Sequence, residues 1–153
     1  MASSERRIAG RRRIAALSAA ALLVVAGSVW LGGRWAEGRQ VAQGRVLYDT
    51  HCASCHGADL RGQPGWQRPG PDGRLPAPPH DASGHTWHHD DALLFRITRD
   101  GSAAVVGGGY ESDMPGFGGL LSDGEIRAVL AFIRSTWPER ERAYQREISR
   151  QAR

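Results

Sequence analysis

The 153-residue chain contains no lysine, two cysteines and, apart from its first residue, one methionine. All twenty basic residues are arginine, and no function follows from the missing lysine. The cysteines lie three positions apart, so a disulfide between them would constrain almost no chain. Strand-like alternation is also lacking, whereas apolar residues recur at helical spacing, and the pattern therefore predicts helices.

The central part of the chain lacks an excess of positive charge. The whole sequence has a formal net charge of +4, but five of its twenty arginines lie within residues 6–13. Between Val41 and Trp137, eight arginines face eleven acidic residues, a net charge of −3. A nucleic-acid-binding domain needs a basic face. We therefore expect no nucleic-acid partner.

Both cysteines belong to the pentapeptide Cys52-Ala53-Ser54-Cys55-His56, which has the C-x-x-C-H pattern of c-type haem attachment. Each thiol can bond one vinyl group of the porphyrin, and the imidazole of His56 then lies under the iron. A redox dithiol would require a βαβ pattern around the cysteines. A zinc site would require two further ligands at suitable spacing. We predict one covalently bound haem c, attached at Cys52 and Cys55, with His56 as iron ligand.

The first part of the chain predicts a membrane anchor. Residues 1–13 are polar and arginine-rich, and residues 14–33 carry no charge. Twenty helical residues span about 30 Å, the hydrocarbon thickness of a bilayer. Because the arginines precede this segment, we expect a cytoplasmic N-terminus, a single pass through a bacterial inner membrane and a haem domain in the periplasm. A cleaved signal peptide, with an apolar core at residues 14–25, is the alternative.

The rest of the chain divides into a short polar linker at residues 34–40, a domain at residues 41–137 and a charged tail at residues 138–153. Helical spacing predicts a first helix from Val41 to about His51. A second is predicted from about Asp90 to Asp100, because acidic residues favour the first turn of a helix and Gly101 ends it.

Three further segments complete the predicted domain and tail. Residues 57–83 contain six prolines, and an irregular segment of that length in a compact domain is expected to wrap around something, such as a porphyrin edge. Ser122 and Glu125 form a capping-box pattern that begins the last helix of the domain, and Pro138 stops it. The tail predicts a frayed or surface-docked helix with Tyr144 and Ile148 as its apolar pair.

An iron with one histidine ligand needs a second axial ligand if it is to transfer electrons without binding gases. Met114 is the candidate, because Pro115 holds it in an extended conformation on a stiff loop. A thioether ligand raises the reduction potential relative to a second histidine. Four neighbouring histidines compete for the position, or form a copper or zinc site of their own: His80, His85, His88 and His89.

Together these features resemble the class I c-type cytochromes, in particular the small membrane-anchored monohaem type of bacteria. The resemblance covers residues 41–137 and rests on the haem-attachment motif, the Gly44-x-x-x-Tyr48 pattern before it, Met114-Pro115 and the helix from Ser122 to Trp137. It implies an all-α cytochrome c fold, with three to four helices around one covalently bound haem and the first and last helices crossing near it.

The resemblance also implies particular contacts. Gly44 would allow close approach of the two crossing helices, and Tyr48 would pack on Phe132. A proline carbonyl would accept a hydrogen bond from the second ring nitrogen of the proximal histidine and so fix its tautomer. Pro64 and Pro69 are both candidates for that proline.

These observations predict an electron-transfer protein and not an enzyme. We expect a periplasmic-facing carrier of one electron, which accepts it from a redox protein such as a respiratory complex or a dehydrogenase and passes it to a terminal acceptor. A gas-binding sensor or enzyme subunit with a labile Met114 is one alternative. A cytochrome subunit of a larger oxidoreductase complex is another, and a metal-binding module built on residues 80–89 is a third.

Overall fold

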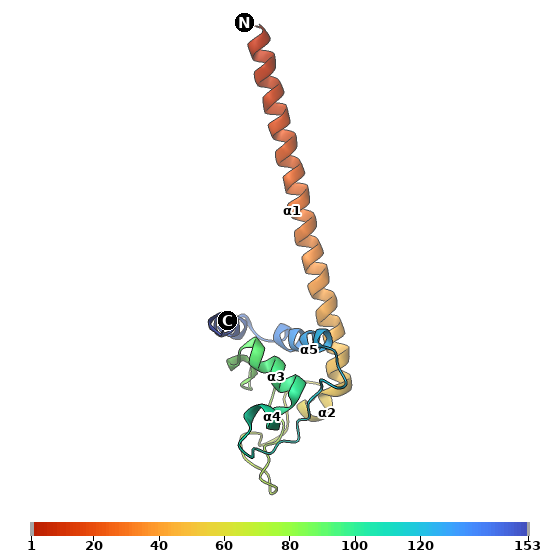
Figure 1. Cartoon of the computed structure of the whole chain (residues 1–153), viewed down its shortest axis with the longest axis vertical. Coiled ribbons are helices and arrows are strands. Elements are labelled where there is room, and N and C mark those ends of the chain that lie inside the picture. Colours follow the sequence, from red (N-terminus) through yellow and green to blue (C-terminus); the bar gives the residue numbers. More distant parts are fainter. Residues whose placement is uncertain (1, 153) are drawn as a thin grey trace. The chain divides into compact units, whose positions relative to one another are not determined.

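The computed structural model describes the backbone of residues 2–152, and side chains at residue 22 and at residues 25–152. Over these residues the chain is helical and irregular, without strands (Figure 1). It divides into two units, Met1–Arg39 and Gln40–Arg153. The prediction of an all-α fold is therefore confirmed for the described residues.

The first helix, α1, covers Ala2–His51 and so belongs to both units. In the part of the chain that is described, no helix combines the length and apolar character needed to cross a bilayer. The predicted anchor at residues 14–33 falls partly outside that description, since the side chains of residues 14–21, 23 and 24 are not described.

The polar linker predicted at residues 34–40 is helical and continues α1. The prediction that the first helix begins at Val41 was therefore wrong. The physical reason lies in the composition of the segment, which contains no proline and one glycine, Gly38. Alanine, arginine, glutamate and glutamine favour a helix even where no apolar stripe marks one.

The core of the second unit forms where the end of α1 packs against α5, Asp123–Ser135. Tyr48 is fully buried, and its ring lies 5.4 Å from that of Phe132, centroid to centroid. A Cβ added to Gly44 would lie 1.9 Å from the backbone oxygen of Ala128, so only glycine permits this approach. Both contacts implied by the family resemblance are present.

Two further helices, α3 at Asp91–Asp100 and α4 at Ser102–Val106, follow each other, and α3 also packs against α5. The side chain of Asp90 accepts a hydrogen bond from Leu93 N at the start of α3. At the start of α5, Ser122 and Glu125 form the predicted capping box. These local signals correctly placed both helix starts.

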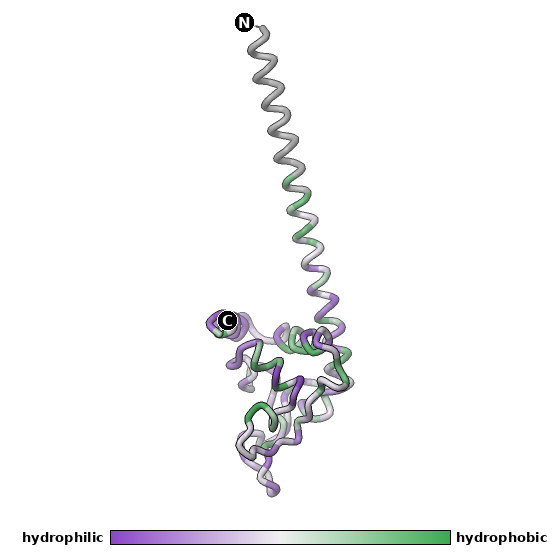
Figure 2. Tube along the Cα trace, in the orientation of Figure 1, coloured by the Kyte–Doolittle hydropathy of each residue, from purple (hydrophilic) through white to green (hydrophobic). Residues whose placement is uncertain are grey.

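The charged tail forms α6, Glu139–Gln151, which packs against the short 3₁₀ helix η1, Thr86–His88. Figure 2 colours α6 mainly as hydrophilic, and its buried residues are polar: Gln145 and Ser149. Gln145 Nε2 donates to Asp91 Oδ1 at 2.9 Å, and Ser149 Oγ accepts from Asp91 N at 3.0 Å. The tail is therefore docked on the domain through these hydrogen bonds and through the ring of Tyr144, which lies edge-on to Trp87 at 5.5 Å although it remains 46% exposed.

Candidate haem site

The two cysteines lie at the junction between α1 and the short helix α2, Ala53–His56. Cys52 N donates to Tyr48 O at 2.8 Å and His56 N donates to Cys52 O at 3.0 Å, so the backbone keeps its helical turn through the motif. Both thiols are free; Cys52 is half-buried and Cys55 is exposed. Helical geometry therefore brings the two thiols and the imidazole together within a single turn.

His56 is buried, with 6% of its surface exposed, and its Nδ1 lies 2.9 Å from the carbonyl oxygen of Pro78. Because a carbonyl can only accept, Nδ1 carries the proton and Nε2 keeps its lone pair free for a metal. Burial lowers the pKa of His56, and the bond to Pro78 opposes that shift. The neutral imidazole is thus held in the tautomer that an iron ligand requires.

Pro78, and neither Pro64 nor Pro69, supplies the carbonyl that accepts from His56 Nδ1, so both predicted candidates were wrong. The reason is the folding of the proline-rich segment back on itself. Gln63 N donates to Ala77 O at 2.9 Å and His80 N donates to Leu60 O at 2.8 Å. These backbone bonds carry the carbonyl of Pro78 to His56, although 22 residues separate the two in sequence.

His80 lies directly beside His56. The two rings are stacked, with centroids 3.9 Å apart and planes 16° from parallel. The backbone oxygen of His80 accepts a hydrogen bond from Trp137 Nε1 at 2.7 Å, which joins this loop to the buried core residue Trp137. Burial, with smaller effects from His56 and His85, lowers the pKa of His80. Its neutral ring therefore supports the wall of the site against which His56 packs.

Met114 lies on the loop between α4 and α5 and is half-buried. Its Sδ atom accepts a hydrogen bond from Ser102 Oγ at 3.3 Å, and its backbone N–H donates to Ser112 Oγ at 3.2 Å. Among the described hydrogen bonds and ring contacts, none joins Met114 to the turn that carries Cys52, Cys55 and His56. The loop thus presents a positioned thioether on an element separate from the attachment motif.

The other histidines engage in ring contacts. His88 stacks on Trp87 at 3.6 Å, and His85 lies parallel to Trp66 at 5.4 Å and edge-on to His89 at 5.3 Å. No group of three or more metal-binding side chains was found among the described residues. Trp87 Nε1 donates to Ala82 O at 3.3 Å. This segment therefore packs through aromatic rings, a role that differs from the alternative of a copper or zinc site.

The site residues fit a covalently attached haem. Two free thiols and an imidazole with an unprotonated Nε2 share one helical turn, and this donor set matches the chemistry of haem c attachment. A class of protein follows from the fold and the site: an all-helical, haem-binding domain in which the haem is bonded to the chain.

The chain belongs to the cytochrome c family. The family model described as "Cytochrome c" matches residues 41–137. A curated relative, the "Cbb3-type cytochrome c oxidase subunit CcoP" of Azospirillum sp. (strain B510), is 30% identical over 103 residues. That match covers 67% of this chain and 31% of the relative, so the chain spans about a third of the length of the protein it resembles. No solved structure matches the chain significantly.

Family membership means that the protein is a c-type cytochrome with covalently bound haem c, and it indicates electron transfer. Three features of the site escaped the sequence analysis. They are the hydrogen bond from His56 to Pro78, the hydrogen bond from Ser102 to Met114, and the ion pair between Arg74 and Asp113, the residue before Met114. All three depend on how irregular segments meet. No local sequence pattern marks such meetings, whereas the attachment motif is contiguous and was found directly.

Proposed function

We propose that the protein is a one-electron carrier with a single haem c, bound by His56 on one face of the iron and by Met114 on the other. The observation that carries this proposal is the hydrogen bond from His56 Nδ1 to Pro78 O, which leaves Nε2 as the ligand atom. A haem with two fixed protein ligands changes its oxidation state without opening a coordination position. The chain then only has to bind, orient and shield the group.

Met114 fits the second position for three reasons. It is the only methionine of residues 2–153. Pro115 follows it, and its backbone and sulfur atoms are each hydrogen-bonded to a serine. It lies on a different element from His56, as two ligands on opposite faces of a porphyrin must. A thioether ligand raises the reduction potential relative to a second histidine, as suits a carrier that receives electrons from a respiratory donor.

We further propose that the segment at residues 14–33 anchors the protein in the inner membrane of a bacterium, with the haem domain in the periplasm. The absence of charge in this segment and the arginines before it support this arrangement. A tether confines the carrier near its redox partners and raises their effective concentration, so weak and fast docking is sufficient.

A second candidate function is a subunit of a larger oxidoreductase complex. The relative named above is a subunit of a cytochrome c oxidase, and 67% of this chain aligns with it. Solubilisation of native membranes in a mild detergent, followed by size separation and haem staining, distinguishes the two. A free carrier migrates near its own mass, whereas a subunit co-migrates with its complex.

Replacement of Met114 tests the ligand set. In Met114→Ala, we expect the sulfur-to-iron(III) charge-transfer band of the oxidised protein to vanish, the midpoint potential to fall and carbon monoxide to bind the reduced protein. The wild type should be low-spin and unaffected by carbon monoxide. Unchanged spectra and potential in the variant would show that Met114 is not the ligand. Carbon monoxide binding by the wild type would favour the gas-sensor alternative.

A further inference from the structure

The chain segments before and after Met114 are held in place by different kinds of contact. After Met114, the loop is bonded to the end of α3: Phe117 N donates to Thr98 O at 3.0 Å and Gly118 N donates to Arg99 O at 2.9 Å. A Cβ added to Gly116 would come within 2.7 Å of the backbone of Asp100, so this part of the loop lies directly on α3. The downstream side of Met114 is therefore fixed by the backbone alone.

Before Met114, the chain passes through Gly107, Gly108 and Gly109, all with positive φ. A Cβ added at any of the three would meet no other atom within 4 Å, so no packing restricts them. Glycine loses more conformational freedom on ordering than any other residue. This side of the loop needs a restraint from elsewhere if Met114 is to stay in place.

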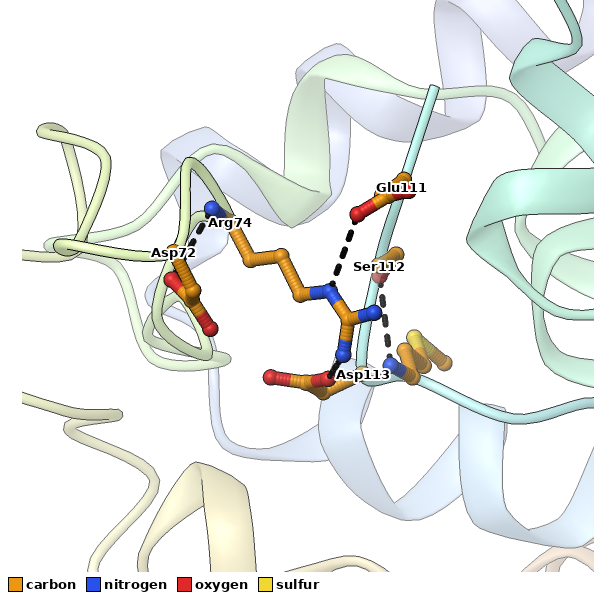
Figure 3. Close-up of polar contacts among 6 residues, drawn as sticks. Asp72, Arg74, Glu111, Ser112 and Asp113 are labelled. Carbon is orange, nitrogen blue, oxygen red and sulfur yellow. Dashed lines mark hydrogen bonds and ion pairs between the residues drawn. The ribbon is translucent and has the colours of Figure 1, made fainter. Parts of the chain in front are cut away.

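Arg74 supplies that restraint from the proline-rich segment. Its Nη1 atom lies 2.5 Å from Asp113 Oδ1, and its Nε atom lies 3.4 Å from Glu111 Oε2 (Figure 3). Among the described hydrogen bonds and ion pairs of residues 107–113, these two reach a distant part of the chain, whereas the others join residues no more than four positions apart. Asp113 is the residue immediately before Met114.

Arg74 is itself positioned by a tight turn. Gly70 N donates to Arg74 O at 2.8 Å, and Arg74 N donates to Asp72 Oδ1 at 3.1 Å. Figure 3 shows the guanidinium of Arg74 between the carboxylates of Glu111 and Asp113, with the aliphatic part of the side chain extending from this turn. The planar guanidinium suits two separate carboxylate acceptors, because its N–H groups diverge at fixed angles.

We propose that Arg74 is a positioning residue, which holds the upstream side of the Met114 loop and thereby keeps the thioether at the iron. The proposal deepens the ligand assignment made above and rests on it. The proline-rich segment then positions both proposed iron ligands, since Pro78 orients His56 and Arg74 restrains Met114. We call the two ion pairs from Arg74 to Glu111 and Asp113 the clamp. Loss of the clamp would open the loop locally and leave the core formed by α1 and α5 intact.

The size of the effect follows from the exposure of the clamp. Side chains of Arg74, Glu111 and Asp113 are 40%, 69% and 65% exposed, so each pair is partly solvated. Two exposed ion pairs together change a local equilibrium by about two- to thirty-fold. The clamp is also expected to weaken as salt rises, because exposed charges are screened at about 1 M ionic strength.

The test compares Arg74→Ala with Arg68→Ala in the full-length, haem-loaded protein. Arg68 is an exposed arginine of the same segment for which no ion pair is described. Imidazole serves as the probe, since it binds the oxidised iron when Met114 leaves. We expect Arg74→Ala to bind imidazole about two- to thirty-fold more tightly than Arg68→Ala at low salt. Arg74→Lys should restore part of the difference, and about 1 M salt should remove it. Equal imidazole affinities would overturn the proposal.

Amide hydrogen exchange at Tyr110 and Met114, whose N–H groups donate to Gly107 O and Ser112 Oγ, separates this proposal from the ligand assignment. Faster exchange in Arg74→Ala, together with unchanged imidazole binding, would show that Arg74 restrains the loop without holding the thioether at the iron. It would overturn the proposal and leave the ligand assignment to the Met114→Ala test. Unchanged exchange would overturn the clamp while leaving the ligand assignment to the Met114→Ala test. If Arg74→Ala does not accumulate, the double variant Glu111→Gln/Asp113→Asn removes the same ion pairs from the other side and must give the same result.

Discussion

A Cβ added to Gly62 would lie 2.6 Å from the backbone of Pro78, whose carbonyl oxygen is the hydrogen-bond partner of His56. The loop that orients His56 therefore closes tightly over a residue without a side chain. Gly62 has a φ of +67°, and its N–H donates to His56 O at 2.8 Å. The conformation of Gly62 and the position of the Pro78 carbonyl are thus directly linked.

Gly62→Ala is expected to push the Pro78 carbonyl away from His56. Gly65→Ala is the matched control, because Gly65 has a φ of +70° and nothing within 4 Å of an added Cβ. Both variants carry the cost of a positive φ, but only the first adds a steric collision, for which we expect about 1–3 kcal/mol of additional destabilisation in denaturant unfolding.

The same pair of variants gives a prediction for the midpoint potential. A weaker hydrogen bond at Nδ1 makes His56 a poorer electron donor to iron, so the midpoint potential should rise in Gly62→Ala alone. Equal stabilities and potentials for the two variants would contradict this account.

The sequence revealed those parts of the site that depend on contiguous residues. The haem-attachment motif lies within five residues, and the capping box at Ser122 within four, so chemistry and spacing can be interpreted together. Pro78 was missed because its position depends on backbone bonds between residues 60–63 and 77–80, and six prolines in one segment give no local reason to prefer one.

The docking of α6 shows a second limit of sequence interpretation. Tyr144 and Ile148 have the spacing of an apolar face, yet Gln145 and Ser149 are the buried residues. Their common partner is Asp91, which is 54 residues from Gln145. Tyr144 does contact the ring of Trp87, at 5.5 Å, but apolar periodicity detects burial through the hydrophobic effect and does not reveal the buried residues that are held by hydrogen bonds.

The helix crossing near the core gives a prediction for stability. In Gly44→Ala, the new Cβ would lie 1.9 Å from Ala128 O, and the end of α1 must separate from α5. We expect a loss of about 1–3 kcal/mol in the free energy of unfolding. Gly38→Ala is the control within the same helix, because an added Cβ there meets nothing within 4 Å, and it should be neutral or slightly stabilising. Thermal unfolding monitored by haem absorbance checks both; a neutral Gly44→Ala would mean that the helices tolerate a wider separation.

The two thiols should differ in reactivity before haem attachment. Burial, and to a lesser extent the neighbouring Cys55, raises the pKa of Cys52 from 9.0 to about 11. Because the thiolate is the reactive form, roughly one Cys52 in a thousand is reactive at about pH 8. In the haem-free chain, iodoacetamide should therefore modify exposed Cys55 first, and the rate at Cys52 should increase about tenfold per pH unit up to about pH 11.

Mass spectrometry of the alkylated peptide resolves this order when it is combined with single Cys52→Ser and Cys55→Ser variants. In a denaturant, burial is abolished and the two rates should become similar. A Cys52 that reacts as fast as Cys55 in the folded, haem-free chain would show that the turn is open before attachment.

The hydrogen bond from Ser102 to Met114 gives a prediction for the reduction potential. Ser102 Oγ lies 3.3 Å from Met114 Sδ, at the first residue of α4. A hydroxyl that donates to sulfur withdraws electron density from it, so the thioether stabilises iron(III) less well and the potential is raised. In Ser102→Ala the midpoint potential should fall by about 10–40 mV, the range expected when part of a typical hydrogen bond is lost in a one-electron couple.

Ser135→Ala is the control, because the hydroxyl of Ser135 donates to Phe132 O on α5 and has no described contact with Met114. Redox titration of the three proteins decides the matter: a potential in Ser102→Ala equal to that of the control would mean that the hydroxyl turns away from the sulfur once the thioether is bound to iron.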